Sequence, residues 1–252
     1  MKTRWMGMLA LMSFPAMCEP LNLAVAANFT APMQIIIQDY QDKTGEQVRM
    51  SVGASGKFVA QIRHGAPFDI FFSADQAKPQ ALMKAGLAEP GSMRTYAVGS
   101  LALWSVNPEA DVRQQLEKGH FRKLALANPK LAPYGSAAVA VLENLGLHEI
   151  TQSKWVRGEN IAQTFQFVQS GNADLGFVAL SQLLTEKDTA DTNLWIVPAA
   201  LHPPIRQDRV VMKKSAQKSA VKRFLAHFQG AESQAVILSY GYALPVDGTD
   251  GL

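Results

Sequence analysis

The stretch LNLAVAANFTAPMQIIIQDYQDKTGEQVRMSVG, residues 21–53, decides the fold class. It opens with Leu21 to Ala26, a short apolar run of the kind found in buried parallel strands. From Pro32 to Gln41 the apolar residues recur at helical spacing, and Gly45 is expected to end that helix. A second strand is expected from Val48 to Val52. A strand, a helix and a strand in this order predict a parallel sheet with a right-handed crossover.

The same alternation continues along the chain. The apolar segment from Thr95 to Val106 is long, and we interpret it as the crossing into a second lobe, where the pattern restarts. Apolar spacing and closing glycines place the remaining elements. The expected strands are Asp69–Ser73, Lys123–Ala127, Asp174–Leu180 and Leu194–Val197, with a return to the first lobe beginning at Arg209–Met212. The expected helices are one that ends at Gly65, and Pro79–Ala85, Ala137–Leu145, Ile161–Gln169, Ser215–Phe228 and Glu232–Tyr240.

The length of the chain fits two lobes. Its 252 residues allow two lobes of about 100 residues each. We expect an α/β fold in which mixed, mostly parallel sheets are flanked by helices and a ligand cleft lies between the lobes. The expected boundaries are 19–98 for the first part of lobe 1, 99–204 for lobe 2 and 205–252 for the return to lobe 1.

Composition excludes several classes of protein. A hydrophobic content of 48% with 18% charged residues supports a substantial core and argues against disorder. The net charge of +3 is too weak and too scattered for a nucleic-acid-binding protein. The five histidines form no close-spaced ligand pair, and no Ser-His-Asp or Cys-His set can be assembled. We therefore expect neither a metal site nor a catalytic site.

The N-terminus resembles a secretory signal peptide at residues 1–18. Lys2 and Arg4 precede a short apolar stretch, and the small-x-small pattern that ends at Cys18 indicates cleavage before Glu19. Two alternatives remain: a buried N-terminal helix, and a lipidated Cys18, although Met17 is bulky for that processing. Cys18 is the only cysteine, so its removal would leave a chain without thiols or disulfides.

Four turns offer small polar groups or bare backbone amides where a helix is about to begin. The first turn of a helix leaves its N–H groups without internal partners and carries the positive end of the helix dipole, so it is a ready anion site. Four such turns, without a competing catalytic base or metal cluster, indicate a cleft that holds a small anion through neutral donors. The turns are Ala26–Thr30, Gly53–Lys57, Ala132–Ser136 and Gly158–Ile161.

Two of the candidate donors lie in the first lobe. Ser55 offers a hydroxyl, with the amides of Gly56 and Lys57 pointing into the cleft; the alternative is a plain helix N-cap. Asn28 ends the first strand, and its side-chain amide could donate to a ligand or cap the following helix. Thr30 is the rival cap.

The second lobe supplies the other candidates. Tyr134 could reach the cleft with its phenol or pack under a loop, and Ile161 offers only its backbone N–H. Glu159 is the only carboxylate in the four turns, and we expect it to point to solvent. Asp69 and Asp75 flank a Phe-rich strand and are expected to cap or hinge neighbouring elements.

Several of these segments together resemble the periplasmic molybdate-binding proteins of ABC importers. The resemblance covers essentially the whole chain after residue 18. Its most specific part is the Gly-Ala-Pro-x-Asp-x-Phe-x-Ser-Ala-Asp pattern at residues 65–75. The other matching stretches are Ala26–Phe29, Gly53–Gly56, Asn128–Pro129 with Ala132–Gly135, and Asp174–Leu180.

The resemblance implies a two-lobed type II periplasmic binding protein fold. In this family an oxyanion lies between the lobes and is held by neutral hydrogen bonds, with no protein atom bound directly to the metal. Many members place a binding tyrosine on the late strand, where this chain has Ala179, so Tyr134 would be the substitute. Carried over by position, the ligand-binding residues are Ala27 (through its amide), Asn28, Ser55, Tyr134 and Ile161 (through its amide).

The expected function is capture of molybdate or tungstate outside the cytoplasmic membrane and delivery to the permease of an ATP-driven importer. The protein is then periplasmic and monomeric, catalyses no reaction, needs no cofactor and binds no nucleic acid. The alternatives are a sulfate-binding protein, a regulatory ligand-sensing domain and a secreted hydrolase that uses Ser55. A hydrolase needs a base within reach of the serine, and the sequence names none.

Overall fold

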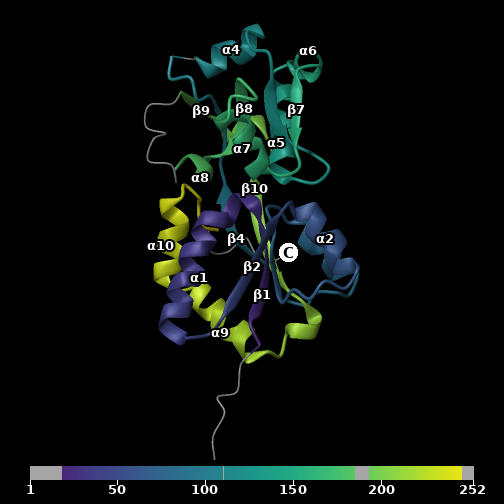
Figure 1. The fold of residues 1–252 in the computed structure, drawn as a ribbon. Helices are drawn as coiled ribbons and strands as arrows, with labels where there is room; N and C mark the ends of the chain where they lie inside the picture. Colours follow the sequence, from purple (N-terminus) through teal and green to yellow (C-terminus); the bar gives the residue numbers. More distant parts are fainter. Residues whose placement is uncertain (1–18, 110, 185–192, 246–252) are drawn as a thin grey trace, which may run out of the picture.

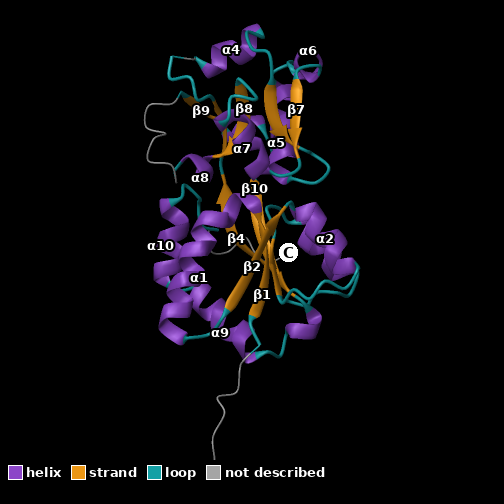
Figure 2. Cartoon of the chain, in the orientation of Figure 1, coloured by secondary structure: helices purple, strands orange, loops and turns teal. Residues whose placement is uncertain are grey.

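The computed structural model describes residues 19–109, 111–184 and 193–245, which form two lobes stacked end to end (Figure 1). Each lobe is built on one five-stranded sheet with helices packed on it (Figure 2). The predicted signal peptide at 1–18, with Cys18, lies outside the described residues.

The first sheet has the strand order β2-β1-β3-β10-β4. Strand β1 runs parallel to β2 and β3, while β10 is antiparallel to both of its neighbours, so the sheet is mixed. The strands of this sheet are β1 (Leu21–Ala26), β2 (Val48–Gly53), β3 (Ile70–Phe72), β4 (Arg94–Gly99) and β10 (Ile205–Val211).

Helices cover both faces of the first sheet because its strands alternate two sets of apolar side chains. Leu23 and Val25 of β1 pack toward α1, α9 and α10, whereas Ala24 packs toward α2 and α3. Helix α1 ends at Gly45 as predicted, since Gly45 adopts the left-handed conformation (φ 70°) that favours glycine. The elements are α1 (Thr30–Thr44), α2 (Ser55–Arg63), α3 (Ala77–Lys84), α9 (Ser219–Phe228) and α10 (Ala231–Ser239), with 3₁₀ turns η1 (Ala27–Phe29) and η4 (Lys213–Ser215).

The second sheet has the order β7-β6-β8-β5-β9. Strand β6 is parallel to β7 and β8, and β5 is antiparallel to β8 and β9. Its strands are β5 (Leu101–Trp104), β6 (Leu124–Ala127), β7 (Trp155–Gly158), β8 (Leu175–Ala179) and β9 (Leu194–Ile196). Its helices are α4 (Val112–Lys118), α5 (Pro133–Asn144), α6 (His148–Gln152), α7 (Ile161–Gln169), α8 (Leu180–Leu183) and the 3₁₀ turn η3 (Ala199–Leu201).

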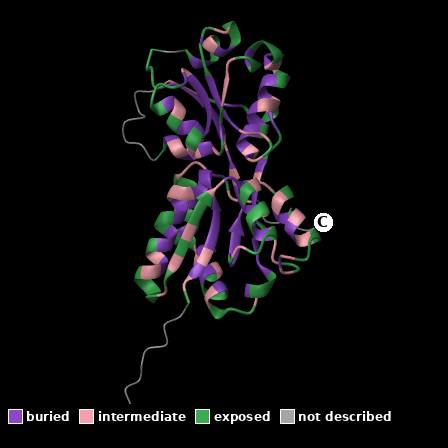
Figure 3. Ribbon diagram, turned by 45° about the vertical axis from the view of Figure 1, so that its right-hand side comes forward, coloured by how far each residue is buried: buried purple, intermediate pink, exposed green. Residues whose placement is uncertain are grey.

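Two connections join the sheets. The predicted crossing within Thr95–Val106 is confirmed, because β4 ends the first sheet at Gly99 and β5 opens the second at Leu101. The chain returns through the segment between β9 and β10. The inner strands of both sheets are buried, whereas the edge strand β2 and the outward helix faces are largely exposed (Figure 3). Within the described ranges, no helix is both long enough and apolar enough to span a membrane.

Several sequence predictions differ from the structure. The sheets, expected to be mostly parallel, contain as many antiparallel as parallel pairings. The helix predicted from Ala137 begins at Pro133, and α4 and α6 were not predicted.

The helix predicted from Ser215 begins at Ser219, because Ser215 lies in η4 and donates its hydroxyl to Asp69 Oδ1 (2.6 Å). The returning strand begins at Ile205, four residues before Arg209, since its polar centre hides the pattern. Strand β7 was not predicted; it lies at the edge of its sheet and lacks a continuous buried run.

Candidate functional site

A small cavity lies between the lobes, where the four predicted turns meet. Its volume is about 10 Å³, close to the least space that one water molecule needs, so the two lobes leave little room between them. No charged side chain lines it. The structure brings all five predicted residues to its wall: Ala27, Asn28 and Ser55 from the first lobe, and Tyr134 and Ile161 from the second.

Ser55 is the first residue of α2, and it is not the N-cap. The cap position is Ala54, which has no side chain to donate or accept, so the plain N-cap alternative is wrong. Ser55 is 1% exposed, and its Oγ accepts a hydrogen bond from the Ala74 N–H (3.0 Å). Because a serine hydroxyl also carries one hydrogen, Ser55 can donate toward the cavity while Ala74 holds its oxygen in place.

The amides next to Ser55 do not face the cavity, which corrects the sequence interpretation. The Gly56 N–H donates to the Leu131 carbonyl (2.9 Å), and the Lys57 N–H donates to the Ala54 carbonyl (3.0 Å). Leu131 follows β6 in the other lobe, so the Gly56 bond joins the two lobes. The start of α2 therefore contributes the Ser55 hydroxyl to the cavity, and the Gly56 N–H to a bond that holds the two lobes together.

Asn28 is buried in η1, and its side-chain amide is already engaged. Its Nδ2 donates to Gln207 Oε1 (2.8 Å) and to the Tyr242 hydroxyl (3.0 Å), which uses both amide hydrogens. The expected donation from this side chain to a ligand would break one of those bonds. Asn28 and Ala27 instead occupy the first turn of η1, whose N–H groups lack acceptors within the helix. Thr30, the rival cap, donates its hydroxyl to the Ala27 carbonyl (2.9 Å).

Tyr134 is the second residue of α5 and is 2% exposed. Its hydroxyl oxygen accepts a hydrogen bond from Gln207 Nε2 (3.2 Å). Burial raises the pKa of the Tyr134 phenol well above its ordinary value, so the hydroxyl keeps its hydrogen at neutral pH. Gly135 lets α5 begin this close to β6, because a Cβ there would overlap the Ala127 carbonyl.

Ile161 is the first residue of α7, and Asn160 is the N-cap of this helix. The Asn160 side chain accepts from the Gln163 N–H (3.0 Å), which satisfies another donor of the same first turn. Glu159, expected to point to solvent, is half-exposed and forms an ion pair with Lys57 of the other lobe. The carboxylate is therefore not among the residues that line the cavity.

Asp69 and Asp75 support neighbouring elements, as predicted. Asp69 is buried and accepts from the Asn22 N–H (2.7 Å) and from Lys218 Nζ (2.9 Å). Asp75 accepts from the Lys78 N–H (3.1 Å) at the start of α3. These carboxylates bind the protein's own donors and do not form a catalytic pair.

Residues 21–243 match the family model described as bacterial extracellular solute-binding protein. The chain belongs to this family. The two-lobed type II binding-protein fold expected from the sequence is thereby confirmed, and this solute-binding protein is not an enzyme.

Molybdate-binding proteins of other bacteria resemble this solute-binding protein over nearly its full length. The molybdate-binding protein ModA of Azotobacter vinelandii is 46% identical over 236 residues, which covers 93% of this chain and 94% of that protein. ModA of Rhodobacter capsulatus is 41% identical over 232 residues, covering 92% and 91%. The solved structure of the A. vinelandii periplasmic molybdate-binding protein superposes with a TM-score of 0.84 at 38% identity, covering 90% of this chain and all of that one.

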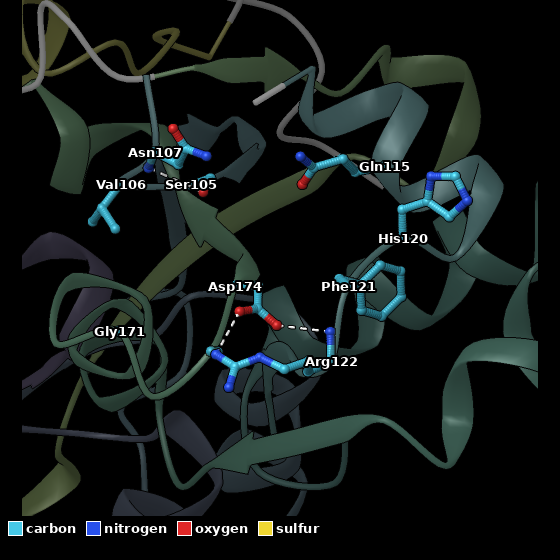
Figure 4. Close-up of a pocket in the computed structure, with 10 residues that line it drawn as sticks. Ser105, Val106, Asn107, Gln115, His120, Phe121, Arg122, Gly171 and Asp174 are labelled. Carbon is cyan, nitrogen blue, oxygen red and sulfur yellow. Dashed lines mark hydrogen bonds and ion pairs between the residues drawn. The ribbon is translucent and has the colours of Figure 1, made fainter. Parts of the chain in front are cut away.

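A larger cavity lies elsewhere in the second lobe and is lined by residues such as Ser105, His120 and Asp174 (Figure 4). It has a volume of about 630 Å³, and its charged groups include Arg122 and Asp174, which pair with each other (3.0 Å). None of the four turns reaches it. The small inter-lobe cavity is the better candidate because it collects helix N-termini from both lobes. Among the described residues, no cluster of His, Cys, Asp and Glu could hold a metal ion.

Sequence reasoning missed the buried polar residues behind the cavity. Gln207 and Tyr242 bond to Asn28, and Ser181 of the second lobe donates its hydroxyl to the Asn28 carbonyl (3.0 Å). The available signal was the polar run Arg206–Arg209, which is flanked by the apolar residues Ile205 and Val210. A buried polar run in a strand indicates partners that lie far away in the sequence.

Proposed function

We propose that this solute-binding protein captures molybdate, or tungstate, in the cavity between its lobes and delivers it to the permease of an ATP-driven importer. The observation that carries the proposal is the cavity wall, where neutral donors from both lobes converge and no charged side chain takes part. Such a wall suits a small, fully deprotonated oxyanion, which needs donors only.

The proposed donors are of two kinds. Ser55 and Tyr134 offer hydroxyl hydrogens, and the first turns of two helices, η1 and α7, offer backbone N–H groups at Ala27, Asn28 and Ile161. Hydrogen bonds to a charged group contribute roughly 1.5–3 kcal/mol each. Because each lobe supplies part of the set, the anion makes its full set of contacts only when the lobes are closed.

The absence of charged side chains from the cavity wall also bears on which oxyanions the site accepts. Phosphate keeps at least one proton near neutral pH, and that proton requires an acceptor in a closed site. Glu159 and Asp75 each adjoin a wall residue in sequence, and each forms an ion pair, Glu159 with Lys57 and Asp75 with Lys78. We therefore propose that phosphate is rejected. Sulfate has the charge of molybdate and differs in size, so it remains the alternative ligand.

The hydrolase alternative finds no support in the cavity. A serine nucleophile needs a base within hydrogen-bond reach, and Ser55 Oγ instead accepts from a backbone N–H. No histidine or carboxylate lines the cavity.

We infer the cellular context from the same proposal. Residues 1–18 act as the signal peptide, which directs the protein to the periplasm. There it acts as a monomer and binds no nucleic acid. The proposed lobe boundaries, 19–98 and 205–252 for lobe 1 and 99–204 for lobe 2, are supported by the strands of each sheet.

Calorimetric titration of the ligand-free protein with molybdate, tungstate, sulfate and phosphate tests the proposal. We expect molybdate and tungstate to bind tightly and phosphate at least about a hundredfold more weakly, which corresponds to roughly 2.7 kcal/mol. Tight sulfate binding with weak molybdate binding would establish the alternative. Displacement of molybdate by phosphate at comparable concentration would contradict the neutral-donor site.

A further inference from the structure

We propose that Gln207 is a positioning residue for the oxyanion site, and that Gly99 keeps the space in which it acts. Gln207 orients the Tyr134 hydroxyl so that its hydrogen points to the ligand, and it connects donors of the two lobes. The inference rests on the proposed function, because it assumes that Tyr134 contacts the anion.

Gln207 is fully buried in the middle of β10 and has partners on both sides of its amide. Oε1 accepts from Asn28 Nδ2 (2.8 Å) and from the Tyr96 hydroxyl (3.0 Å). Nε2 donates to the Tyr134 hydroxyl oxygen (3.2 Å). Because Asn28 Nδ2 can only donate, it requires the amide oxygen on its side, and this orientation presents Nε2 to Tyr134.

This arrangement determines what Tyr134 can do. A phenol has one hydrogen to donate, and here its oxygen already accepts a hydrogen bond from Gln207. The phenol hydrogen is therefore turned away from Gln207. Tyr134 lines the inter-lobe cavity, and the Tyr242 hydroxyl beside it is the acceptor with which a bound anion competes for this hydrogen. An amide that presented its oxygen instead would capture that hydrogen and remove a donor from the site.

Gly99 supplies a second, independent observation. It ends β4 at the crossing between the lobes, and a Cβ there would overlap the Tyr134 hydroxyl and lie 2.6 Å from Gln207 Nε2. Gly99 does not have a positive φ, so space rather than backbone conformation requires glycine at this position. The crossing strand is thus shaped around the contact between Tyr134 and Gln207.

The contact also joins the lobes. Asn28 and Gln207 belong to elements of the first sheet, whereas Tyr134 begins a helix on the second. A glutamine that served only the packing of its own sheet would need no partner in the other lobe. The amide therefore couples a residue behind η1 to a donor carried by α5.

A double-mutant cycle tests the inference. Gln207→Met removes both polar atoms at similar volume, and Asn28 Nδ2 and Tyr96 each keep a second partner, Tyr242 and the Ser73 carbonyl. We expect Gln207→Met and Tyr134→Phe each to weaken molybdate binding about tenfold, and the double variant to bind no more weakly than Tyr134→Phe alone. A structural role alone would make the two effects multiply.

Tyr96→Phe is the matched control. It removes the other hydroxyl that bonds to Gln207 and leaves Tyr134 untouched, so affinity should stay within about threefold of the wild type. Gly99→Ala provides a second route if Gln207→Met does not fold, since its Cβ displaces the Tyr134 hydroxyl. Its loss of affinity should be absent in a Tyr134→Phe background.

The outcomes separate the two proposals. If the wild type does not bind molybdate, the proposed function fails. If the wild type binds but the effects of Gln207→Met and Tyr134→Phe multiply, or Tyr134→Phe has no effect, the inference is overturned while the binding function stands. A non-additive cycle with an unaffected Tyr96→Phe control supports the inference.

Discussion

Ser55 is the side chain whose role in binding can be separated most cleanly from its role in folding. Ser55→Ala removes the proposed hydroxyl donor and leaves the Ala74 N–H without its acceptor. We expect molybdate binding to weaken by about 1–3 kcal/mol, measured by calorimetry, with a smaller loss of unfolding free energy.

Ser136→Ala is the matched control for that serine. Ser136 also lies in the first turn of a helix, but it is exposed and donates to the Pro129 carbonyl (2.8 Å) away from the cavity wall. The Ser136→Ala variant should bind molybdate with the affinity of the wild type. If Ser55→Ala bound as the wild type does but melted much earlier, Ser55 would be structural only.

Asp69 gives the prediction about pH. Burial alone would raise the pKa of this carboxyl, but donation from the Asn22 N–H, Ser215 and Lys218 outweighs it, so the net pKa is lowered. A carboxyl with a lowered folded pKa stabilises the fold above its unfolded pKa of about 3.9, and that stability is lost as the pH falls through the folded value.

Asp69→Asn should therefore lower the unfolding free energy at pH 7 by about 1–3 kcal/mol, with a difference from the wild type that shrinks below about pH 4. Denaturant titrations of both proteins across this range measure it. A difference that does not depend on pH would show that the charge of Asp69 contributes nothing.

The residues that line the inter-lobe cavity could be predicted from the sequence, but their hydrogen-bond partners could not. Helix-start turns and the resemblance pointed to Asn28 and Ser55, and both line the cavity. The orientation of the Asn28 amide depends on Gln207, which lies 179 residues away along the chain. The Gly56 amide likewise turns to Leu131 because of how the lobes meet.

At the scale of elements, α2 and the turn before α7 face each other across the cleft. Lys57 of α2 forms an ion pair with Glu159 of that turn. Both side chains are nearly half-exposed, so the pair contributes at most about 1 kcal/mol. Lys57→Glu should nevertheless speed molybdate release, because two carboxylates then oppose closure.

The double exchange Lys57→Glu with Glu159→Lys restores opposite charges and should return the release rate to near that of the wild type. Stopped-flow measurement at low and high salt checks this, and the effect should shrink at high salt. Equal rates for the single and double variants would show that the pair does not act on closure.

The order of elements could largely be read from apolar periodicity. Strand β1, helix α7 and the crossing after β4 lie where they were expected. Strand β10 was found only in part, because Gln207 and Asp208 are polar yet buried, and their partners come from other elements. Apolar periodicity indicates which apolar side chains are buried away from solvent. It cannot detect polar side chains that are buried with hydrogen-bond partners inside the fold.

For the whole molecule, the contacts between lobes predict a change of shape on binding. The Gly56 bond to Leu131 and the Ser181 bond to Asn28 both require the lobes to be closed. Without an anion, the closed form lacks the additional bonds that a ligand would make to both lobes, so we expect an open form to be populated. X-ray scattering should show a smaller radius of gyration with saturating molybdate, and identical curves would mean a rigid cleft.

The two-lobed organisation could be predicted, but the ranking of anions could not. The size of the cavity depends on where α2, α5 and α7 begin relative to one another, and that spacing is a property of both lobes together. Gly99 and Gly135 influence it through close approaches that no local pattern reveals.

The most direct test of the central claim is to locate the bound anion. Tungstate scatters X-rays anomalously, so a crystal of the complex reveals its position without assumptions about the protein. We predict one strong peak between the lobes, with oxyanion oxygens about 2.7–3.2 Å from Ser55 Oγ, the Tyr134 hydroxyl and the Ile161 N–H. A peak at another place, such as the large cavity beside Arg122, with none between the lobes, would contradict the account.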